Sequence, residues 1–284
     1  MERTLYNGLI SGLSLDGEHF FYPNALESDG VYKFNRGECS RQSWFDCSCC
    51  PSNLIRFLPA VQGLIYAQKK QNVYVNLYVG SQASLQVDNK PVQLRQTTRY
   101  PWDGKVQVEV QAGQGVDMQL KLRVPGWMQG AVLPSDLYHY VHASDAIPKV
   151  SVDGKEIPYA AKDGYITIDG PWKNNTLIEL DFPMDVHMVQ AIEEVVEDRG
   201  KVSLEYGPVV YAVESTDNPN GFDDLKIQKE EAFQIHWTPG LLQGVNVLEG
   251  VSPTGSFKAI PYYAWSNRGI AKMKVWLPAE MNEY

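Results

Sequence analysis

Leucines near the N-terminus recur at the spacing of an α-helix. Leu5, Leu9 and Leu13 lie one helical turn apart and line one face of a helix that we expect over residues 1–15. An Asp-Gly pair directly after this segment is a stop signal. Residues 18–46 then show no sustained period, and we expect a long loop there. A loop of this length in a compact domain is usually functional.

A second helix is predicted from Pro51 to Gln62. Proline suits the first helical position, because the N–H that it lacks has no partner there. The apolar residues that follow have the spacing of a core-facing stripe: Leu54, Phe57, Leu58, Val61 and Leu64. Pro59 lies inside this segment and either kinks the helix or ends it early.

Beyond residue 65 the hydrophobic period changes from that of a helix to that of a strand. Apolar and polar residues alternate in five segments: 73–79, 106–110, 118–124, 165–168 and 177–182. Four further strand-like segments come later in the chain: 202–206, 209–213, 258–265 and 273–277. Turn residues such as Asp-Gly and Pro-Gly separate many of them, which is typical of antiparallel β-sandwiches.

These patterns predict a mainly β chain in three parts. Residues 1–66 form a short helical segment, residues 67–184 a β-sandwich and residues 185–284 a second β-sandwich. Two short helices are not expected to bury their apolar faces on each other alone, so the helical segment should belong to a domain whose remainder is absent. Met1 also opens directly onto the helical pattern, without the apolar region of a signal peptide, as if the chain were cut from a longer protein.

Composition and charge narrow the classes of partner. The 284 residues are 44% hydrophobic and 21% charged, which is ordinary for a globular protein. A net charge of −9 argues against a nucleic acid or an anionic membrane as the main partner. The sequence holds no apolar run long enough to span a membrane. Its 16 Tyr, 9 Phe and 7 Trp suit stacking on sugar rings, although β-rich proteins are commonly rich in aromatic residues.

The cysteines are confined to one short stretch of the chain: Cys39, Cys47, Cys49 and Cys50. A secreted protein stapled by disulfides would spread its cysteines, so this clustering indicates metal or thiol chemistry and favours a cytoplasmic location. Cys49 and Cys50 directly precede the predicted helix. Free N–H groups and the positive end of the helix dipole favour a thiolate at such a place.

Three interpretations of this cluster remain open on the residues alone. Cys49 and Cys50 could be two ligands of a zinc ion, which prefers sulfur and four ligands. All four cysteines could instead form a structural zinc site, although their spacing is not that of the common paired Cys-x2-Cys knuckles. They could also be small buried hydrophobic residues.

Short sequence motifs along the chain, taken in order, resemble those of glycoside hydrolase family 127, the zinc-thiolate β-L-arabinofuranosidases. The most specific motif is Cys49-Cys50-Pro51. The related family 146 has the same general layout and chemistry, so the motifs resemble that family as well. The resemblance covers essentially the whole chain and is carried by residues 5–9, 14–17, 20–27, 44–53, 75–79, 122–127, 207–211 and 260–269.

This resemblance implies an (α/α)6 barrel, of which residues 1–66 are the end, followed by β-sandwich domains. It implies hydrolysis of terminal β-L-arabinofuranosides with retention, and a zinc ion held by three cysteines and a glutamate. Cys49 would be nucleophile and ligand, Cys50 a ligand, and Tyr22 a residue near the sugar of an arabinose-containing glycan. A glutamate acts as general acid/base in the family.

The chain departs from the family pattern in one respect. The acid/base glutamate and the Glu-x-Cys zinc ligands lie upstream of the first matching residue, and no Glu-x-Cys occurs in these 284 residues. We therefore expect the chain to be inactive alone, or to fold against a missing N-terminal half. The alternative is a non-catalytic carbohydrate-binding or structural β-sandwich protein with vestigial cysteines.

Overall fold

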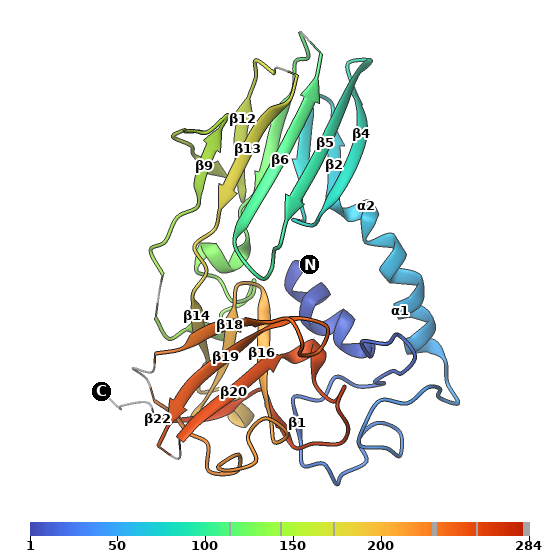
Figure 1. The fold of residues 1–284 in the computed structure, drawn as a ribbon, viewed down its shortest axis with the longest axis vertical. Helices are drawn as coiled ribbons and strands as arrows, with labels where there is room; N and C mark the ends of the chain where they lie inside the picture. Colours follow the sequence, from blue (N-terminus) through green and yellow to red (C-terminus); the bar gives the residue numbers. More distant parts are fainter. Residues whose placement is uncertain (114, 143, 173, 229–231, 254, 281–284) are drawn as a thin grey trace. The chain divides into compact units, whose positions relative to one another are not determined.

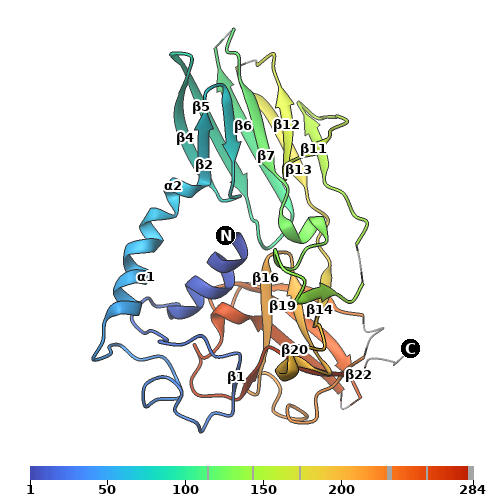
Figure 2. The same ribbon diagram turned by 180° about the vertical axis from the view of Figure 1, so that it is seen from behind.

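The structure, a computed structural model, describes residues 1–113, 115–142, 144–172, 174–228, 232–253 and 255–280 (Figures 1 and 2). Its fold is mainly β, as predicted. The chain forms two compact units. Unit 1 comprises Met1–Leu58, Ala131–Ala143 and Asp185–Tyr284, and unit 2 comprises Pro59–Gly130 and Ser144–Met184.

Unit 2 is built from two sheets, which the opposite views of Figures 1 and 2 show as two layers. In spatial order, the six-stranded sheet contains β10 (Lys155–Glu156), β9 (Lys149–Val152), β13 (Thr176–Asp181), β6 (Lys105–Ala112), β5 (Lys90–Thr98) and β4 (Ser81–Val87). The five-stranded sheet contains β11 (Ala161–Lys162), β12 (Tyr165–Asp169), β7 (Gln119–Arg123), β3 (Asn72–Val75) and β2 (Tyr66–Lys69). All described pairings in these sheets are antiparallel except β3 with β7.

Alternation along the strands of unit 2 has the predicted physical cause. In β6, Val106, Val108 and Val110 are buried while Lys105 and Gln107 are exposed. Successive side chains of a strand point to opposite faces, so one face fills the core and the other meets solvent.

Unit 1 contains a branched sheet of eleven strands. Its main path is β17 (Ile227–Gln228), β22 (Leu277–Glu280), β15 (Lys201–Tyr206), β16 (Val209–Glu214), β20 (Gly255–Pro261), β19 (Val245–Ser252) and β18 (Gln234–Thr238). The branches are β14 (Val186–Ala191) beside β15, β8 (Tyr138–Tyr140) beside β14, β21 (Met273–Lys274) beside β16, and β1 (Glu27–Ser28) beside β21. The loop that carries β1 thus joins the sheet.

The helical pieces are short. They are α1 (Cys49–Ala60), α2 (Gln62–Ile65), a π-helical turn (Thr4–Leu9) and the 3-10 turns Ile10–Gly12, Gly126–Gln129, Val196–Asp198 and Tyr262–Ala264. The N-terminal helix is therefore shorter than predicted, because Leu13 leaves it to form a β-bridge with Phe20. The strand predicted over residues 258–265 was wrong beyond Pro261, where the 3-10 turn replaces it.

The N-terminal turn is fixed to the sheet by two polar side chains. Arg3 pairs through both terminal nitrogens with the carboxylate of Glu205, which is only 2% exposed. Asn7 donates from Nδ2 to the carbonyl of Pro208 at 2.8 Å and accepts from the amide of Val210 at 2.8 Å. The amide of Asn7 therefore pairs with the backbone between β15 and β16, much as a neighbouring strand would.

Buried Asn35 organises the long loop at residues 18–46. Its Oδ1 accepts from the amide of Tyr22 at 2.7 Å, and its Nδ2 donates to the carbonyls of Phe20 at 3.2 Å and Ser40 at 2.7 Å. The side chain thus replaces the backbone partners that this irregular segment lacks.

Buried Arg41 ties the same loop to the end of β20. Its guanidinium donates to the carbonyls of Trp265, Ser11 and Tyr263. It also lies 4.2 Å from the ring centroid of Phe21, which stacks on Trp265 with centroids 4.8 Å apart. Within the described ranges, no helix is long and apolar enough to cross a membrane.

We predict that Arg41→Met lowers the free energy of unfolding of unit 1 by about 3 kcal/mol, because buried carbonyls lose their donor. Chemical denaturation followed by hydrogen exchange at unit 1 peptides measures this loss. Lys226→Met is the control, since Lys226 pairs with Glu280 at the surface and its removal should cost less than about 1 kcal/mol. Equal stability of the two variants would contradict an anchoring role for Arg41.

Candidate active site

Cys49 and Cys50 are the first two residues of α1. The amide of Ser52 donates to the carbonyl of Ser48 at 3.0 Å, and its hydroxyl donates to the same oxygen at 2.6 Å, which closes the first turn. The Cys49 side chain is exposed and that of Cys50 is half-buried. As the sequence predicts, the pair lies where the helix dipole favours an anion.

Three polar atoms surround the sulfur of Cys49. The Tyr22 hydroxyl lies 3.6 Å from Cys49 Sγ, the sulfur of Cys47 lies at 3.5 Å and that of Cys50 at 3.6 Å. Tyr22, for which the family resemblance implies a place near the sugar, thus lies directly beside Cys49. The sequence did not predict a separate contact for Cys47. Its position two residues before Cys49 was the feature that could have indicated one.

The pKa values of the two thiols in the Cys49–Cys50 pair are shifted in opposite directions. The hydrogen bond from the Tyr22 hydroxyl, with help from the Cys47 and Cys50 thiols, lowers the pKa of Cys49 to about 7. Burial, followed by the interaction with Cys49, raises the pKa of Cys50. The sequence predicts a lowered pKa for a thiol at the start of the helix. The pKa of Cys49 is indeed lowered, chiefly by the hydrogen bond from Tyr22, whereas the pKa of Cys50 is raised, chiefly by burial.

The Tyr22 phenol is positioned by contacts on several sides. Its ring meets Phe45 edge to face with centroids 5.5 Å apart, and the guanidinium of Arg36 lies 4.0 Å from its ring centroid. Arg36 has a left-handed backbone with φ of 54°, directly after the buried Asn35 that binds the Tyr22 amide. Sequence reasoning missed Asn35 and Arg36, and only the neighbouring glycine, Gly37, hinted at a special turn.

A hollow of about 180 Å³ lies beside the cysteines within unit 1. Its walls include Leu9, Phe20, Tyr22, Cys50 and Leu54. The hollow has mainly apolar walls with a few polar groups, and Cys49 itself is not among the residues that line it.

Other residues of the same loop do not join the cluster. Cys39 is buried, and its thiol donates to the carbonyl of Val31 at 3.3 Å, so the four-cysteine zinc site is not assembled. Trp44 is exposed, as is Asp46, for which the described part of the chain shows no hydrogen bond to the cysteine loop. Arg41 supports the loop rather than the thiols.

The cysteines fit half of a zinc site. Zinc–sulfur bonds of about 2.3 Å in a tetrahedron place two sulfur ligands about 3.8 Å apart. The sulfur atoms of Cys49 and Cys50 are separated by 3.6 Å, close to that spacing. Among the described residues, however, no group of three or more His, Cys, Asp or Glu side chains is arranged to hold a metal. Further ligands would have to come from outside these residues.

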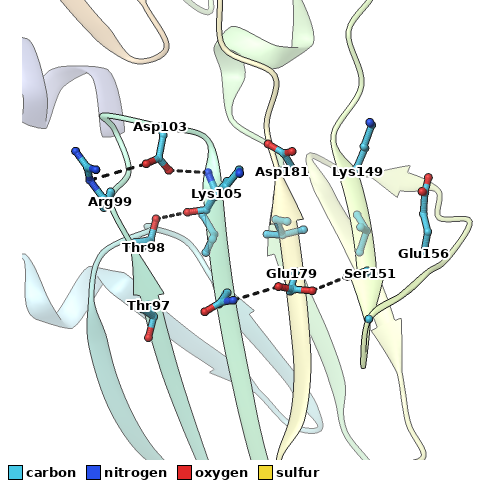
Figure 3. Close-up of a pocket in the computed structure, with 15 residues that line it drawn as sticks. Thr97, Thr98, Arg99, Asp103, Lys105, Lys149, Ser151, Glu156, Glu179 and Asp181 are labelled. Atoms are coloured by element: carbon cyan, nitrogen blue, oxygen red, sulfur yellow. Dashed lines mark hydrogen bonds and ion pairs between the residues drawn. The ribbon is translucent and has the colours of Figure 1, made fainter. Parts of the chain in front are cut away.

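A larger hollow, of about 600 Å³, lies on the outer face of the six-stranded sheet of unit 2 (Figure 3). There Glu179 accepts hydrogen bonds from Gln107 and Ser151 at 3.1 and 3.2 Å, and Asp181 lies between the neighbouring strand positions Lys105 and Lys149. None of the 15 described residues that line it is aromatic. It therefore lacks the ring surfaces on which sugars stack.

Comparison with known families assigns three consecutive parts of the chain to one of them. The model of the β-L-arabinofuranosidase GH127 catalytic domain matches residues 1–63, that of the GH127 middle domain residues 72–184, and that of the glycoside hydrolase family 127 C-terminal domain residues 186–278. The chain belongs to glycoside hydrolase family 127. The family predicted from the sequence motifs along the chain is thus confirmed.

Individual GH127 proteins give the same result. A non-reducing end β-L-arabinofuranosidase of Bifidobacterium longum is 27% identical over 97% of this chain and 44% of its own length. A solved GH127 β-arabinofuranosidase is 41% identical, with a TM-score of 0.91 over 98% of this chain and 45% of the other. A GH127 β-L-arabinofuranosidase from Geobacillus stearothermophilus T6 is 35% identical, with a TM-score of 0.86 over 99% of this chain and 46% of the other. The GH127 chain described here spans less than half the length of these relatives.

We predict that alkylation of Cys49 by iodoacetamide rises with pH to half its maximum near pH 7, in a reduced and metal-free chain. A lowered pKa means that the thiolate is present above about pH 7, whereas an ordinary thiol needs a pH of about 8.5. Tyr22→Phe removes the donor and should move the profile to higher pH, whereas the exposed Tyr32→Phe control should not. Peptide mass spectrometry measures the rate, and identical profiles for both variants would exclude a role for the Tyr22 hydroxyl.

Proposed function

We propose that this chain is the C-terminal portion of a retaining glycoside hydrolase that releases terminal β-L-arabinofuranose, with Cys49 as the nucleophile. The observation that carries the proposal is the exposed sulfur of Cys49 at the start of α1, 3.6 Å from the Tyr22 hydroxyl. The names of the relatives supply the substrate class, since they are described as β-L-arabinofuranosidases.

The thiol of Cys49 has the properties that a nucleophile needs. Its pKa of about 7 makes a large share of it thiolate at neutral pH, and the thiolate is the reactive form. Its exposure leaves room for an anomeric carbon to approach. The Tyr22 hydroxyl is close enough to contact both the sulfur and a bound sugar, so we assign Tyr22 to substrate binding.

The proposed reaction has two displacement steps. The Cys49 thiolate attacks the anomeric carbon, a carbon–sulfur bond forms, and the bond to the leaving oxygen breaks as a carboxylic acid protonates that oxygen. Water then attacks the same carbon, its proton passes to that carboxylate, and the carbon–sulfur bond breaks. Two inversions give overall retention.

We assign Cys50 and Cys49 to a shared zinc ion, in keeping with the 3.6 Å between their sulfur atoms. A bound zinc ion would keep the thiols deprotonated. This matters most for Cys50, whose half-buried thiol has a raised pKa and is not a ready thiolate by itself.

The acid/base glutamate and the other zinc ligands are assigned to residues upstream of this chain. We interpret residues 1–66 as the end of an (α/α)6 barrel whose remainder carries them. The relatives are about twice as long as this chain, and only residues 1–63 match the catalytic-domain model, which supports this interpretation.

A non-catalytic carbohydrate-binding protein is the alternative. The outer hollow of unit 2 is the place to expect such binding, but none of its described lining residues is aromatic (Figure 3). Around Cys49, by contrast, buried side chains such as Asn35 and Arg41 hold the loop that brings Tyr22 to the sulfur. The enzymatic proposal is therefore the better supported of the two.

We predict that the isolated chain does not hydrolyse an aryl β-L-arabinofuranoside, and that joining it to an upstream barrel segment of the family restores hydrolysis. In that joined protein, Cys49→Ser should reduce kcat by at least about a thousandfold, since the nucleophile is lost. Cys47→Ser is the matched control on the same loop. Cys47 only assists in lowering the pKa of Cys49, and a serine hydroxyl can still donate, so this variant should lose no more than a few-fold in kcat. Steady-state kinetics of phenol release compares the kcat values of the two variants. A Cys49→Ser variant that keeps its activity would contradict the proposal.

We also predict that the reduced chain binds Zn²⁺ through Cys49 and Cys50. Loss of even an outer-sphere partner usually costs a metal site about tenfold in affinity, so Cys49→Ser and Cys50→Ser should each cost at least that much. Cys39→Ser should cost nothing, because Cys39 lies apart in the loop. Competition with a chromogenic chelator measures the Zn²⁺ affinities. Equal affinities for the unaltered chain and the three variants would contradict the assignment of ligands.

A further inference from the structure

Cys47 takes no bond-forming step in the proposed reaction, yet its thiol is close to that of Cys49. Its side chain is exposed, and its sulfur lies 3.5 Å from the exposed sulfur of Cys49. A disulfide bond is about 2.05 Å long, so the two atoms would have to approach by about 1.5 Å. We propose that Cys47 and Cys49 form an oxidation site for hydroperoxides, at which Cys47 captures oxidised Cys49 in a reversible disulfide.

Geometry favours Cys47 over Cys50 as the capturing thiol. The sulfur of Cys50 is almost as close to Cys49, at 3.6 Å. However, the two residues are adjacent, and Cα atoms joined by a trans peptide are about 3.8 Å apart, below the range of about 4.4–6.8 Å found across disulfides. Both residues also have the helical backbone of α1. A bond between them would have to distort the first turn of that helix.

Cys47 is free of these constraints. It precedes α1 in a bend, and one residue separates it from Cys49. The bend can change its dihedral angles without breaking helical hydrogen bonds. Cys39 cannot compete, because it is buried and its thiol donates to the carbonyl of Val31.

The oxidation proceeds in two balanced steps. The Cys49 thiolate attacks one oxygen of hydrogen peroxide, a sulfur–oxygen bond forms, the oxygen–oxygen bond breaks, and hydroxide leaves to be protonated to water. The Cys47 thiolate then attacks the sulfur of this sulfenic acid, a disulfide forms, and the oxygen leaves as a second water. Two thiols are oxidised and one peroxide is reduced.

The disulfide keeps Cys49 from further oxidation. A sulfenic acid without a neighbouring thiol is oxidised onward to sulfinic acid, which ordinary thiols do not reduce. While the disulfide is present, Cys49 can act neither as a nucleophile nor as a ligand. A dithiol reductant then returns it by thiol–disulfide exchange.

The test uses the full 284-residue chain, reduced, stripped of metal with a chelator and treated with hydrogen peroxide. Non-reducing peptide mass spectrometry should find an intramolecular Cys47–Cys49 disulfide as the main product. Dithiothreitol should remove it. In Cys47→Ser, sulfinic acid at Cys49 should accumulate several-fold faster than in the unaltered chain, whereas Cys50→Ser should form the same disulfide as before.

Two results would overturn this inference. One is a main product that joins Cys49 to Cys50, and the other is sulfinic acid at Cys49 that accumulates equally with and without Cys47. The inference does not rest on the proposed glycosidase function, because the readout is the chemistry of the thiols. An inactive enzyme could still form the disulfide, and an active one could fail to form it.

Discussion

Two buried polar side chains, Asn35 and Arg41, hold the cysteine segment in its observed shape. The loop before α1 has almost no regular structure, so its backbone groups need partners from side chains. Asn35 binds the strand-like stretch that contains Tyr22, and Arg41 fixes the adjoining stretch to carbonyls at the end of β20. The contact between the Tyr22 hydroxyl and the Cys49 sulfur depends on this loop conformation, and that contact is the largest cause of the lowered pKa of Cys49.

This arrangement joins sequence regions that the family models divide. Residues of the catalytic-domain model and residues of the C-terminal-domain model share unit 1, and its contacts run from Asn7 to Pro208 and from Arg41 to Trp265. In unit 1 the sheet of the C-terminal region therefore supports the loop that precedes Cys49. The proposed division of the chain at residues 66 and 184 remains a prediction about domains, distinct from this grouping by contacts.

The sequence predicted those elements whose pattern is local. Alternation indicated β6, β7 and β13, and a proline followed by an apolar stripe indicated α1, with the Cys49–Cys50 pair at its start. β19 was missed, because most of its residues are buried on both faces and do not alternate. β4 was missed because its apolar residues are few. Arg36 was missed because its approach to Tyr22 depends on loop conformation, which periodicity does not encode.

The pair formed by Arg3 and Glu205 has a practical consequence for shortening this chain. Glu205 is enclosed in the sheet, and besides Arg3 it meets only the hydroxyl of Tyr140, at 3.4 Å, among its described side-chain hydrogen bonds. A version trimmed past Arg3 would leave a carboxylate enclosed without its cation, a change that typically costs several kcal/mol. Trimming at the C-terminal end of the described chain would act differently, because it would remove β22, a neighbour of β15, and with it a strand pairing instead of an ion pair.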